Sequence, residues 1–242
     1  MMMQNIVQLL QKQLYILLFI FITTGSFMTA AQAENTRKTL YIEEQTTGSM
    51  QGRPFDFTKK SYYAGDYVYI NDGSQPYRVL CDLKKKKVYL INAHAKQYTE
   101  LTLSRFVELS RQGTGNLSDS QMQVRETGEK KEVAGYNCVQ VVMMIPQMGI
   151  KTTMWVPEKI DVPMKQYFSF ADRTGLGGQV QGINPVLKKY KSYPVQSRTV
   201  PVGAVGVGNI INVKVQKIEY TDVDAGIFSV PAGYTEVQMQ SE

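Results

Sequence analysis

The residues that could carry catalysis or hold a metal are few in this sequence and stand apart from one another. Histidine occurs once, as His94 in the turn-like segment NAHAK, so no second histidine completes a metal site or a triad. Asp222 and Asp224 could ligate calcium, but two carboxylates fall short of an oxygen cage. GLGG at 175–178 lacks the Lys-Ser/Thr that follows a phosphate-binding loop. The sequence therefore predicts a protein that is not an enzyme and needs no metal or cofactor.

The two cysteines, Cys81 and Cys138, are the next candidates for chemistry. In an oxidising compartment, an even cysteine count is typical of a disulfide bridge. Such a bridge would close a loop of 57 residues and would stabilise the fold by up to about 4 kcal/mol. The alternative is two separately buried thiols, each packing as a small apolar side chain. Of these two interpretations, we predict the disulfide bridge between Cys81 and Cys138.

Residues 1–33 have the layout of a secretory signal peptide. Lys12 precedes the apolar run LYILLFIFI at 14–22, and small residues in an A-x-A arrangement follow at 31–33. The apolar run is about half the length of roughly 20 residues that a membrane-spanning helix needs. We therefore expect cleavage before Glu34 and a periplasmic location. An uncleaved membrane anchor is the alternative.

The remaining chain, residues 34–242, suits one domain, since all-β domains routinely run to about 200–250 residues. The sequence carries 27 basic and 21 acidic residues, and Lys12 is the only charge in the signal segment, so the exported part is mildly basic. KKKK at 84–87 is interpreted as a solvated turn that discourages edge pairing, in preference to a polyanion site. Basic residues interleaved with aromatics do not gather into one patch, so no nucleic-acid partner is predicted.

Short runs rich in Val, Ile and Tyr, separated by turn residues, predict antiparallel strands over most of the chain. The runs in the first half are TLYIEEQ, SYYAGDYVYI, QPYRVLCDL, KVYLINA and KQYTEL. NDGS at 71–74 and NAHAK at 92–96 are typical of hairpin turns. Further strands are predicted in QMQVRET, SYPVQSRTV and IINVKVQKIEY.

One segment, GYNCVQVVMMIPQMGIKTTMWV at 135–156, is apolar at nearly every position. Pro146 cannot donate to a strand ladder, and together with Gly149 it predicts a hairpin of the strands NCVQVVMMI and IKTTMWV. Because successive side chains of a strand alternate in direction, Met143 and Met144 point to opposite faces. Both faces are apolar, so the segment must be covered on both sides.

Three segments change from strand-like alternation to helical spacing. They are residues 101–113, 163–171 and 184–191, and the last two are separated by a glycine-rich loop at 175–182. Many antiparallel strands with short inserted helices predict an α+β protein. Its expected form is a curved antiparallel β-sheet with the helices over one face.

Four short patterns mark the middle and the end of the chain. They are Gly-Tyr-x-Cys at 135–138, Trp-Val at 155–156, Lys-x-Tyr at 96–98 after a strand that ends at 92, and Ile-Phe-Ser-Val-Pro-Ala-Gly-Tyr at 227–234. Together they resemble a family of exported bacterial proteins with a domain of unknown function, over roughly residues 60–237. That family is similar in architecture to the lipoprotein carrier and receptor families LolA and LolB. The resemblance implies an open half-barrel with the helices as a lid over an apolar cavity.

The function implied by this resemblance is binding of a hydrophobic ligand in the periplasm, such as an acyl chain, a lipid or a lipoprotein. Methionine is common on surfaces that adapt to varied apolar partners, although filling gaps in a core is its commoner role. The predicted ligand-binding residues are Met143, Met144, Trp155, Phe168, Phe170 and Leu187. The rival hypothesis is an envelope structural or interaction protein, whose half-barrel is filled by its own side chains and whose partner is another envelope protein.

Overall fold

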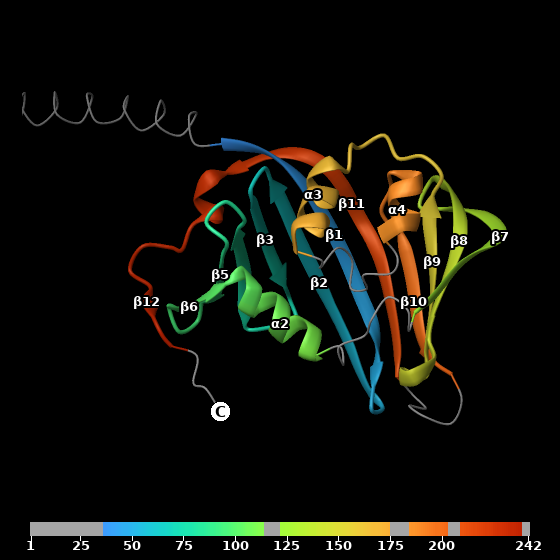
Figure 1. Ribbon diagram of the computed structural model, residues 1–242, viewed down its shortest axis with the longest axis horizontal. Helices are drawn as coiled ribbons and strands as arrows, with labels where there is room; N and C mark the ends of the chain where they lie inside the picture. Colours follow the sequence, from blue (N-terminus) through green and yellow to red (C-terminus); the bar gives the residue numbers. More distant parts are fainter. Residues whose placement is uncertain (1–35, 114–121, 175–183, 203–208, 239–242) are drawn as a thin grey trace, which may run out of the picture.

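The computed structural model describes residues 36–113, 122–174, 184–202 and 209–238 (Figure 1). Strands make up most of these ranges. They are β1 (Thr36–Met50), β2 (Arg53–Ala64), β3 (Tyr67–Asp72), β4 (Tyr77–Asp82), β5 (Lys87–Asn92), β6 (Gln97–Thr102), β7 (Gln123–Val133), β8 (Tyr136–Ile145), β9 (Ile150–Pro157), β10 (Gln196–Pro201), β11 (Ile210–Asp224) and β12 (Thr235–Glu236). The predicted signal peptide at 1–33 and the glycine-rich loop at 175–182 lie outside the described residues.

The helical elements are short. They are α2 (Leu103–Gly113), α3 (Lys165–Thr174) and α4 (Asn184–Tyr190), with the 3-10 turns η2 (Pro146–Met148) and η4 (Ala225–Phe228). They begin and end within a few residues of the helices predicted from the sequence. Within the described ranges, no helix has both the length and the apolar character needed to cross a membrane.

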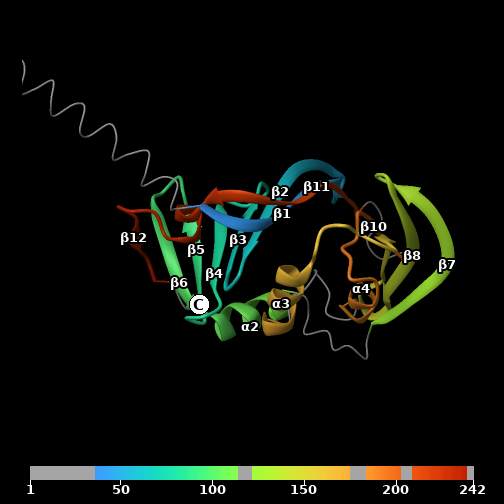
Figure 2. The ribbon, with the colours of Figure 1, turned by 90° about the horizontal axis from the view of Figure 1, so that it is seen from above.

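All the strands of the described residues belong to one sheet, in the order β12-β6-β5-β4-β3-β2-β1-β11-β10-β9-β8-β7. β12 runs parallel to β6, and the other neighbours are antiparallel. The sheet bends around the long strands β1 and β11, so that β2–β6 form one wall and β10–β7 the other (Figure 2). The helices α2, α3 and α4 lie on the concave side of the sheet (Figure 2). The prediction of an α+β protein built on a large, curved antiparallel sheet is confirmed at this level.

The apolar core lies on the concave face of the sheet. Residues two apart on a strand point to the same side, and on this side both walls are apolar. The main cluster of buried residues is Leu40, Ile42, Tyr63, Val68, Cys81, Leu83, Val88, Leu101, Val139, Val141, Met143, Ile145, Met154, Val156, Met164, Tyr167, Phe170 and Leu187. Because α3 buries Tyr167, Phe170, Ala171 and Thr174 at helical spacing, one side of this helix packs into the same core.

The apolar segment 135–156 forms the predicted hairpin. β8 ends at Ile145, η2 makes the turn, and Gly149 adopts a left-handed conformation (φ 60°) before β9 begins. Met143 faces the main core, and Cys138 on the opposite side of the same strand packs into a separate cluster with Val195 and Val215. The inner face of the hairpin is therefore buried, while on the outer face Cys138 and Val142 are buried and Met144 and Trp155 are half-buried.

The chain after β11 returns to the outer face of the first wall. Phe228 of η4 is buried there against Ala64, Leu80 and Ile91. The tail then adds β12 to the edge of the sheet, where the Thr235 backbone N–H donates to the Lys96 carbonyl at 3.0 Å. The predicted tail pattern at 227–234 thus has a structural role, since it covers this apolar outer patch.

The predicted disulfide bridge is wrong in this structure. Cys81 and Cys138 are both buried free thiols. Cys81 is on β4 and Cys138 on β8, and six strands separate β4 from β8 in the sheet. Each sulfur also packs in a different apolar cluster. A bridge needs Cα atoms about 4.4–6.8 Å apart, which these positions do not offer. The alternative from the sequence, two separately buried thiols, describes both residues.

Both thiols should therefore resist alkylation in the folded protein. Burial raises the pKa of Cys81 to about 12 and that of Cys138 to about 11. At about pH 8 the thiolate fractions are then on the order of 10⁻⁴ and 10⁻³, and the thiolate is the reactive form. Iodoacetamide labelling followed by mass spectrometry should find both unmodified in the native protein and both modified in guanidinium chloride. A disulfide-linked peptide pair from the native protein would contradict the prediction.

Candidate functional site

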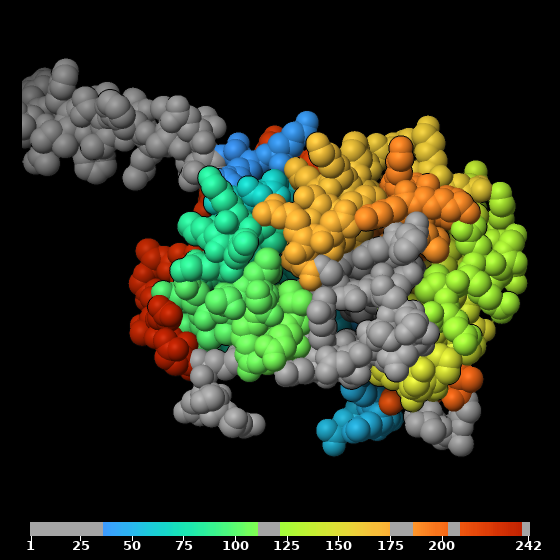
Figure 3. All heavy atoms as spheres, in the orientation of Figure 1, coloured from blue at the N-terminus to red at the C-terminus, as the bar shows by residue number. Residues whose placement is uncertain are grey.

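The candidate site is the interior between α3, α4 and the concave face of the sheet. Figure 3 shows the outer surfaces of these helices on one face of the molecule. Two hydrogen bonds fix the start of α3 over the sheet. The Leu40 backbone N–H of β1 donates to Gln166 Oε1 at 3.2 Å, and Tyr220 Oη of β11 donates to the Pro163 carbonyl at 3.1 Å. At the other end of α3, Arg173 donates to Asp66 and to the Leu83 carbonyl.

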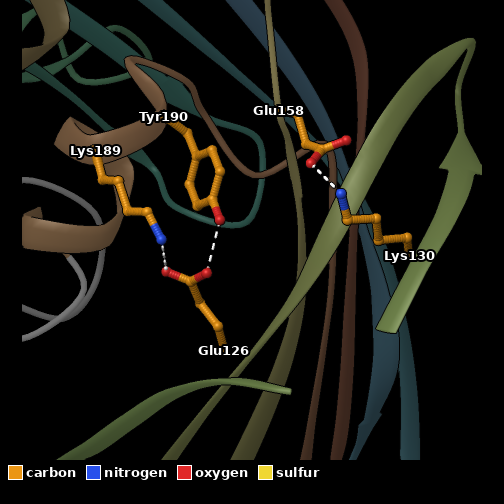
Figure 4. A network of polar contacts seen from close by, with 5 residues as sticks. All are labelled: Glu126, Lys130, Glu158, Lys189 and Tyr190. Carbon is orange, nitrogen blue, oxygen red and sulfur yellow. Dashed lines mark hydrogen bonds and ion pairs between the residues drawn. The ribbon is translucent and has the colours of Figure 1, made fainter. Parts of the chain in front are cut away.

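Polar contacts hold the exposed surface of α4 to β7 and to α3. Glu126 of β7 accepts from Lys189 Nζ and from Tyr190 Oη, both at 2.7 Å (Figure 4). These two hydrogen bonds lower the pKa of the Glu126 carboxyl. Lys188 Nζ donates to Asp172 Oδ1 of α3 at 2.5 Å, which ties the two helices together. On its inner side α4 inserts Leu187, which is fully buried in the main core.

A second pair in the same view holds β7 to the chain that follows β9. Lys130 Nζ donates to Glu158 Oε1 at 2.6 Å (Figure 4). Between Glu126 and Lys130 the pairing of β7 with β8 shifts register. Glu126 is paired with Val141 and Lys130 with Val139. Glu126 reaches α4, and Lys130 reaches Glu158.

The structure brings four of the six predicted ligand-binding residues together. Met143, Phe170 and Leu187 are buried in the main core, and Phe168 packs against it while remaining half-buried. Phe168 also meets the Tyr167 ring edge-on, with ring centroids 5.3 Å apart. The interior next to α3 is therefore aromatic, and Phe168 is one of its half-buried members.

The other two predicted residues, Met144 and Trp155, point away from that interior. Strand alternation places Met144 opposite Met143, and Trp155 opposite the buried Met154 and Val156. Trp155 packs at the smaller cluster of the hairpin's other face, where Lys131 Nζ lies 4.0 Å from the ring centroid. This distance is typical of a cation–π contact.

A buried polar cluster, which the sequence did not reveal, lies on the same concave face. Glu44 of β1 is 5% exposed. Its Oε2 lies 2.7 Å from Lys59 Nζ of β2, and its Oε1 accepts from Tyr193 Oη at 2.9 Å. The ring of Tyr167 on α3 stands edge-on to that of Tyr193, with centroids 5.0 Å apart. We call Glu44, Lys59, Tyr167 and Tyr193 the Glu44 cluster.

The tyrosines around Glu44 remain hydrogen-bond donors at neutral pH. Burial raises the pKa of Tyr63, Tyr167 and Tyr193, and the negative charge of Glu44 raises each of them further. The Tyr193 hydroxyl donates its hydrogen bond to Glu44 Oε1. Tyr167 Oη is buried and has no hydrogen-bond partner among the described residues. A buried polar group without a partner is unusual in folded proteins.

A shallow pocket lies at the rim, where α3 meets the turn between β2 and β3. Its volume is about 400 Å³. It is lined by Gly65, Asp66, Lys165, Gln166, Ser169, Arg173 and Tyr220. These side chains are mainly polar, so the pocket differs in character from the aromatic interior behind α3.

Comparison with protein families gives one match. Residues 70–234 match the family described as "Domain of unknown function (DUF4412)", which confirms the resemblance predicted from the sequence. Comparison with curated proteins gives no match.

Similar solved structures include an uncharacterised conserved protein from Thermus thermophilus, with 9% identity, 89% of this chain and 99% of that chain covered, and a TM-score of 0.47. A DUF1329 family protein from Desulfovibrio piger has 13% identity, coverage of 86% and 96%, and a TM-score of 0.35. A LolA superfamily protein from Nitrosomonas europaea has 8% identity, coverage of 80% and 90%, and a TM-score of 0.32. Since these TM-scores are below 0.5, the function must be argued from this chain's own geometry.

Proposed function

Since the chain belongs to the DUF4412 family, whose domain has no known function, we propose a role from the interior just described. The protein is a non-enzymatic binding or carrier protein for a hydrophobic ligand, such as an acyl chain, a lipid or a lipoprotein. The observation that carries this proposal is the apolar concave face of an open sheet, covered by short helices whose outer sides are held by exposed polar contacts.

The lining of the interior suits varied apolar ligands. Met143 of β8, Met154 of β9 and Met164 before α3 all belong to the main core. Methionine has a flexible, polarisable side chain that repacks at low cost. Three such residues, on two strands and at the start of a helix, would allow the space beside Phe168 to change shape around a ligand.

The helices α3 and α4 would act as a lid. α3 has ten residues and α4 has seven, and helices this short are marginal unless they pack on something. Their outer ion pairs join side chains that are roughly half exposed, such as Lys188 with Asp172. Exposed pairs contribute about 0–1 kcal/mol each. Opening this lid would therefore break few strong polar contacts.

The proposed location is the bacterial envelope, in the periplasm. It rests on the signal peptide expected at 1–33, with cleavage before Glu34. The proposed ligands are consistent with that location, because lipids and acylated proteins belong to the membranes that border it. No covalent step is part of the proposed role.

Replacing Phe168 with Asp should abolish binding of a fluorescent acyl probe. The half-buried ring stands between the aromatic interior and solvent, so a carboxylate there would face the apolar part of a ligand. Binding is measured by fluorescence titration, and the far-UV circular dichroism should stay close to that of the wild type.

Two control variants accompany this measurement. Phe168→Leu keeps an apolar side chain and should retain most of the binding. Trp155→Gln changes the opposite face of β9 and should leave probe binding unchanged. Loss of the fold in Phe168→Asp would identify Phe168 as a plain core residue.

A second candidate function is supported by the close packing of the interior. Val141 and Val156 are 0% exposed, and Leu187 is 1% exposed. An interior already filled by its own side chains would suit an envelope structural or interaction protein, with another envelope protein as its partner. Absence of probe binding by the wild-type protein would favour this role over the carrier.

A further inference from the structure

Binding of an acyl chain needs only an apolar interior, but the Glu44 cluster adds buried polar groups to the same concave face. Glu44 follows Leu40 and Ile42 on the inward side of β1, and both of these residues are fully buried. Residues two apart on a strand share a face, and the pairing of β1 with β2 runs without a break through these positions. The carboxylate therefore lies inside the molecule, where it contacts Lys59 and Tyr193.

Three members of the Glu44 cluster contact one another through their polar atoms. The charge of Glu44 is balanced by Lys59, and its second oxygen accepts the proton of Tyr193. The ion pair has no net charge, and the Lys59 side chain is 21% exposed. Glu44 Oε1 and the Tyr193 hydroxyl satisfy each other, whereas Glu44 Oε2 has the ion pair with Lys59 but accepts no hydrogen bond among the described residues.

The hydroxyl of Tyr167 is left over. It is buried without a hydrogen-bond partner in the described part of the chain. The ring cannot easily turn away, because it meets the rings of Tyr63, Phe168 and Tyr193 at centroid distances of 5.8, 5.3 and 5.0 Å. Burial and the charge of Glu44 raise the pKa of Tyr167 and so keep its proton in place. A buried donor that is fixed in place calls for an acceptor.

The charge of the site selects the kind of acceptor. A ligand carboxylate or phosphate that approached Tyr167 would also approach Glu44, and like charges repel strongly where water is scarce. Lys59 offers little compensation, since it is already 2.7 Å from Glu44. An uncharged carbonyl oxygen accepts the same hydrogen bond without that repulsion.

We infer that Tyr167, beside the Glu44–Lys59 pair, forms a polar subsite for the uncharged carbonyl group of an acyl ester or amide. The acyl chain of the same ligand would lie along Phe168 and Met143. This inference rests on the proposed function and specifies its ligand class: esterified or amidated acyl chains are bound in preference to free fatty acids.

The test compares ligands that have a similar hydrocarbon chain and differ in the group at its end. Methyl laurate, laurate and dodecane displace the uncharged probe N-phenyl-1-naphthylamine from the wild-type protein at about pH 8. Methyl laurate should displace the probe at about a tenfold lower concentration than laurate. Glu44→Gln, which removes the charge with little change of shape, should narrow that ratio by improving the binding of laurate.

Two tyrosine variants separate a ligand contact from a structural role. Tyr167→Phe should weaken the binding of methyl laurate by about 2- to 10-fold and should leave the binding of dodecane unchanged. Its melting temperature should equal or exceed that of the wild type, because no protein partner is lost. Tyr193→Phe is the matched control. It removes a hydroxyl that donates to Glu44, so it should lower the melting temperature.

The outcomes distinguish the two proposals. Probe binding with equal displacement by methyl laurate and laurate would overturn the inference and leave the carrier function standing. Unchanged methyl laurate binding in Tyr167→Phe would also overturn it, since the hydroxyl would then be satisfied by water. Failure of all three ligands and the probe to bind would overturn the proposed function, and the inference with it.

Discussion

Lys59→Met is expected to lower the free energy of unfolding by about 3–5 kcal/mol, because breaking a buried ion pair leaves an uncompensated charge. The Glu44 side chain is 6% exposed, and its Oε2 has Lys59 Nζ at 2.7 Å. Methionine keeps the apolar stem of the lysine but not the ammonium. Urea denaturation at neutral pH measures the loss.

The neighbouring lysine supplies a matched control. Lys60 pairs with Glu43 across the same two strands, at 3.9 Å and with side chains 44% and 28% exposed. Lys60→Met should change the unfolding free energy by about 0–1 kcal/mol. Adding Glu44→Gln to Lys59→Met should recover much of the loss, because the amide carries no charge. If Lys59→Met is as stable as the wild type, water must already reach the carboxylate.

Leu187→Ala is expected to cost about 2–5 kcal/mol of unfolding free energy, as for other large-to-small changes at buried leucines. Leu187 is 1% exposed and is the buried anchor of α4 in the main core. The expected loss is measured by urea denaturation. Hydrogen exchange of the α4 amides should report faster local opening.

A control on the same helix separates packing from surface charge. Lys188→Ala removes the exposed pair with Asp172 and should change stability by about 0–1 kcal/mol. Leu187 was predicted from the sequence as a ligand-binding residue. A loss near the upper end of the range in Leu187→Ala would mean that the side chain fills the interior by itself, whereas a small loss would leave room for a ligand beside it.

Local patterns carried much of the fold prediction. Alternation, turn residues and the Pro146–Gly149 break identify most strands and the central hairpin, because these features depend on a few neighbouring residues. SYYAGDYVYI, predicted as one strand, is instead the end of β2 and the start of β3, joined by a turn at Gly65–Asp66. The pairing of β1 with β11 could not be predicted in this way. It joins segments from opposite ends of the chain, and the sequence of neither strand identifies the strand with which it pairs.

The predicted set combined residues from both faces of the hairpin, because both faces are apolar and the sequence does not show which one is concave. Neighbours on a strand point to opposite faces, so a set that contains both Met143 and Met144 cannot lie on one wall. The same rule separates Trp155 from the buried Met154. Met144 and Trp155 therefore lie on the face of the hairpin opposite the main core.

The Glu44 cluster escaped prediction for another reason. In TLYIEEQ the sequence predicts that Glu43 and Glu44 are both exposed to solvent, because charged residues are seldom fully buried. The available signal was positional, since Glu44 continues the inward series of Leu40 and Ile42. Its partner Lys59 lies opposite it on the next strand, so this contact depends on the register of β1 and β2. Tyr193 is remote in the sequence, and its contact depends on the course of the chain after α4.

The pairing of β1 with β11 also dictates the order of events in folding. Thr36 pairs with Asp224 and Ser49 with Ile210, so the partners are 188 and 161 positions apart. Contacts this distant in the chain form slowly, because loop-closure entropy is lost before they contribute. β2 to β6 can assemble early as successive hairpins, but one edge of β1 stays open until β11 has been synthesised. The two walls therefore join only when almost the whole chain is available, and a chain that ends before residue 210 lacks the strand that connects them.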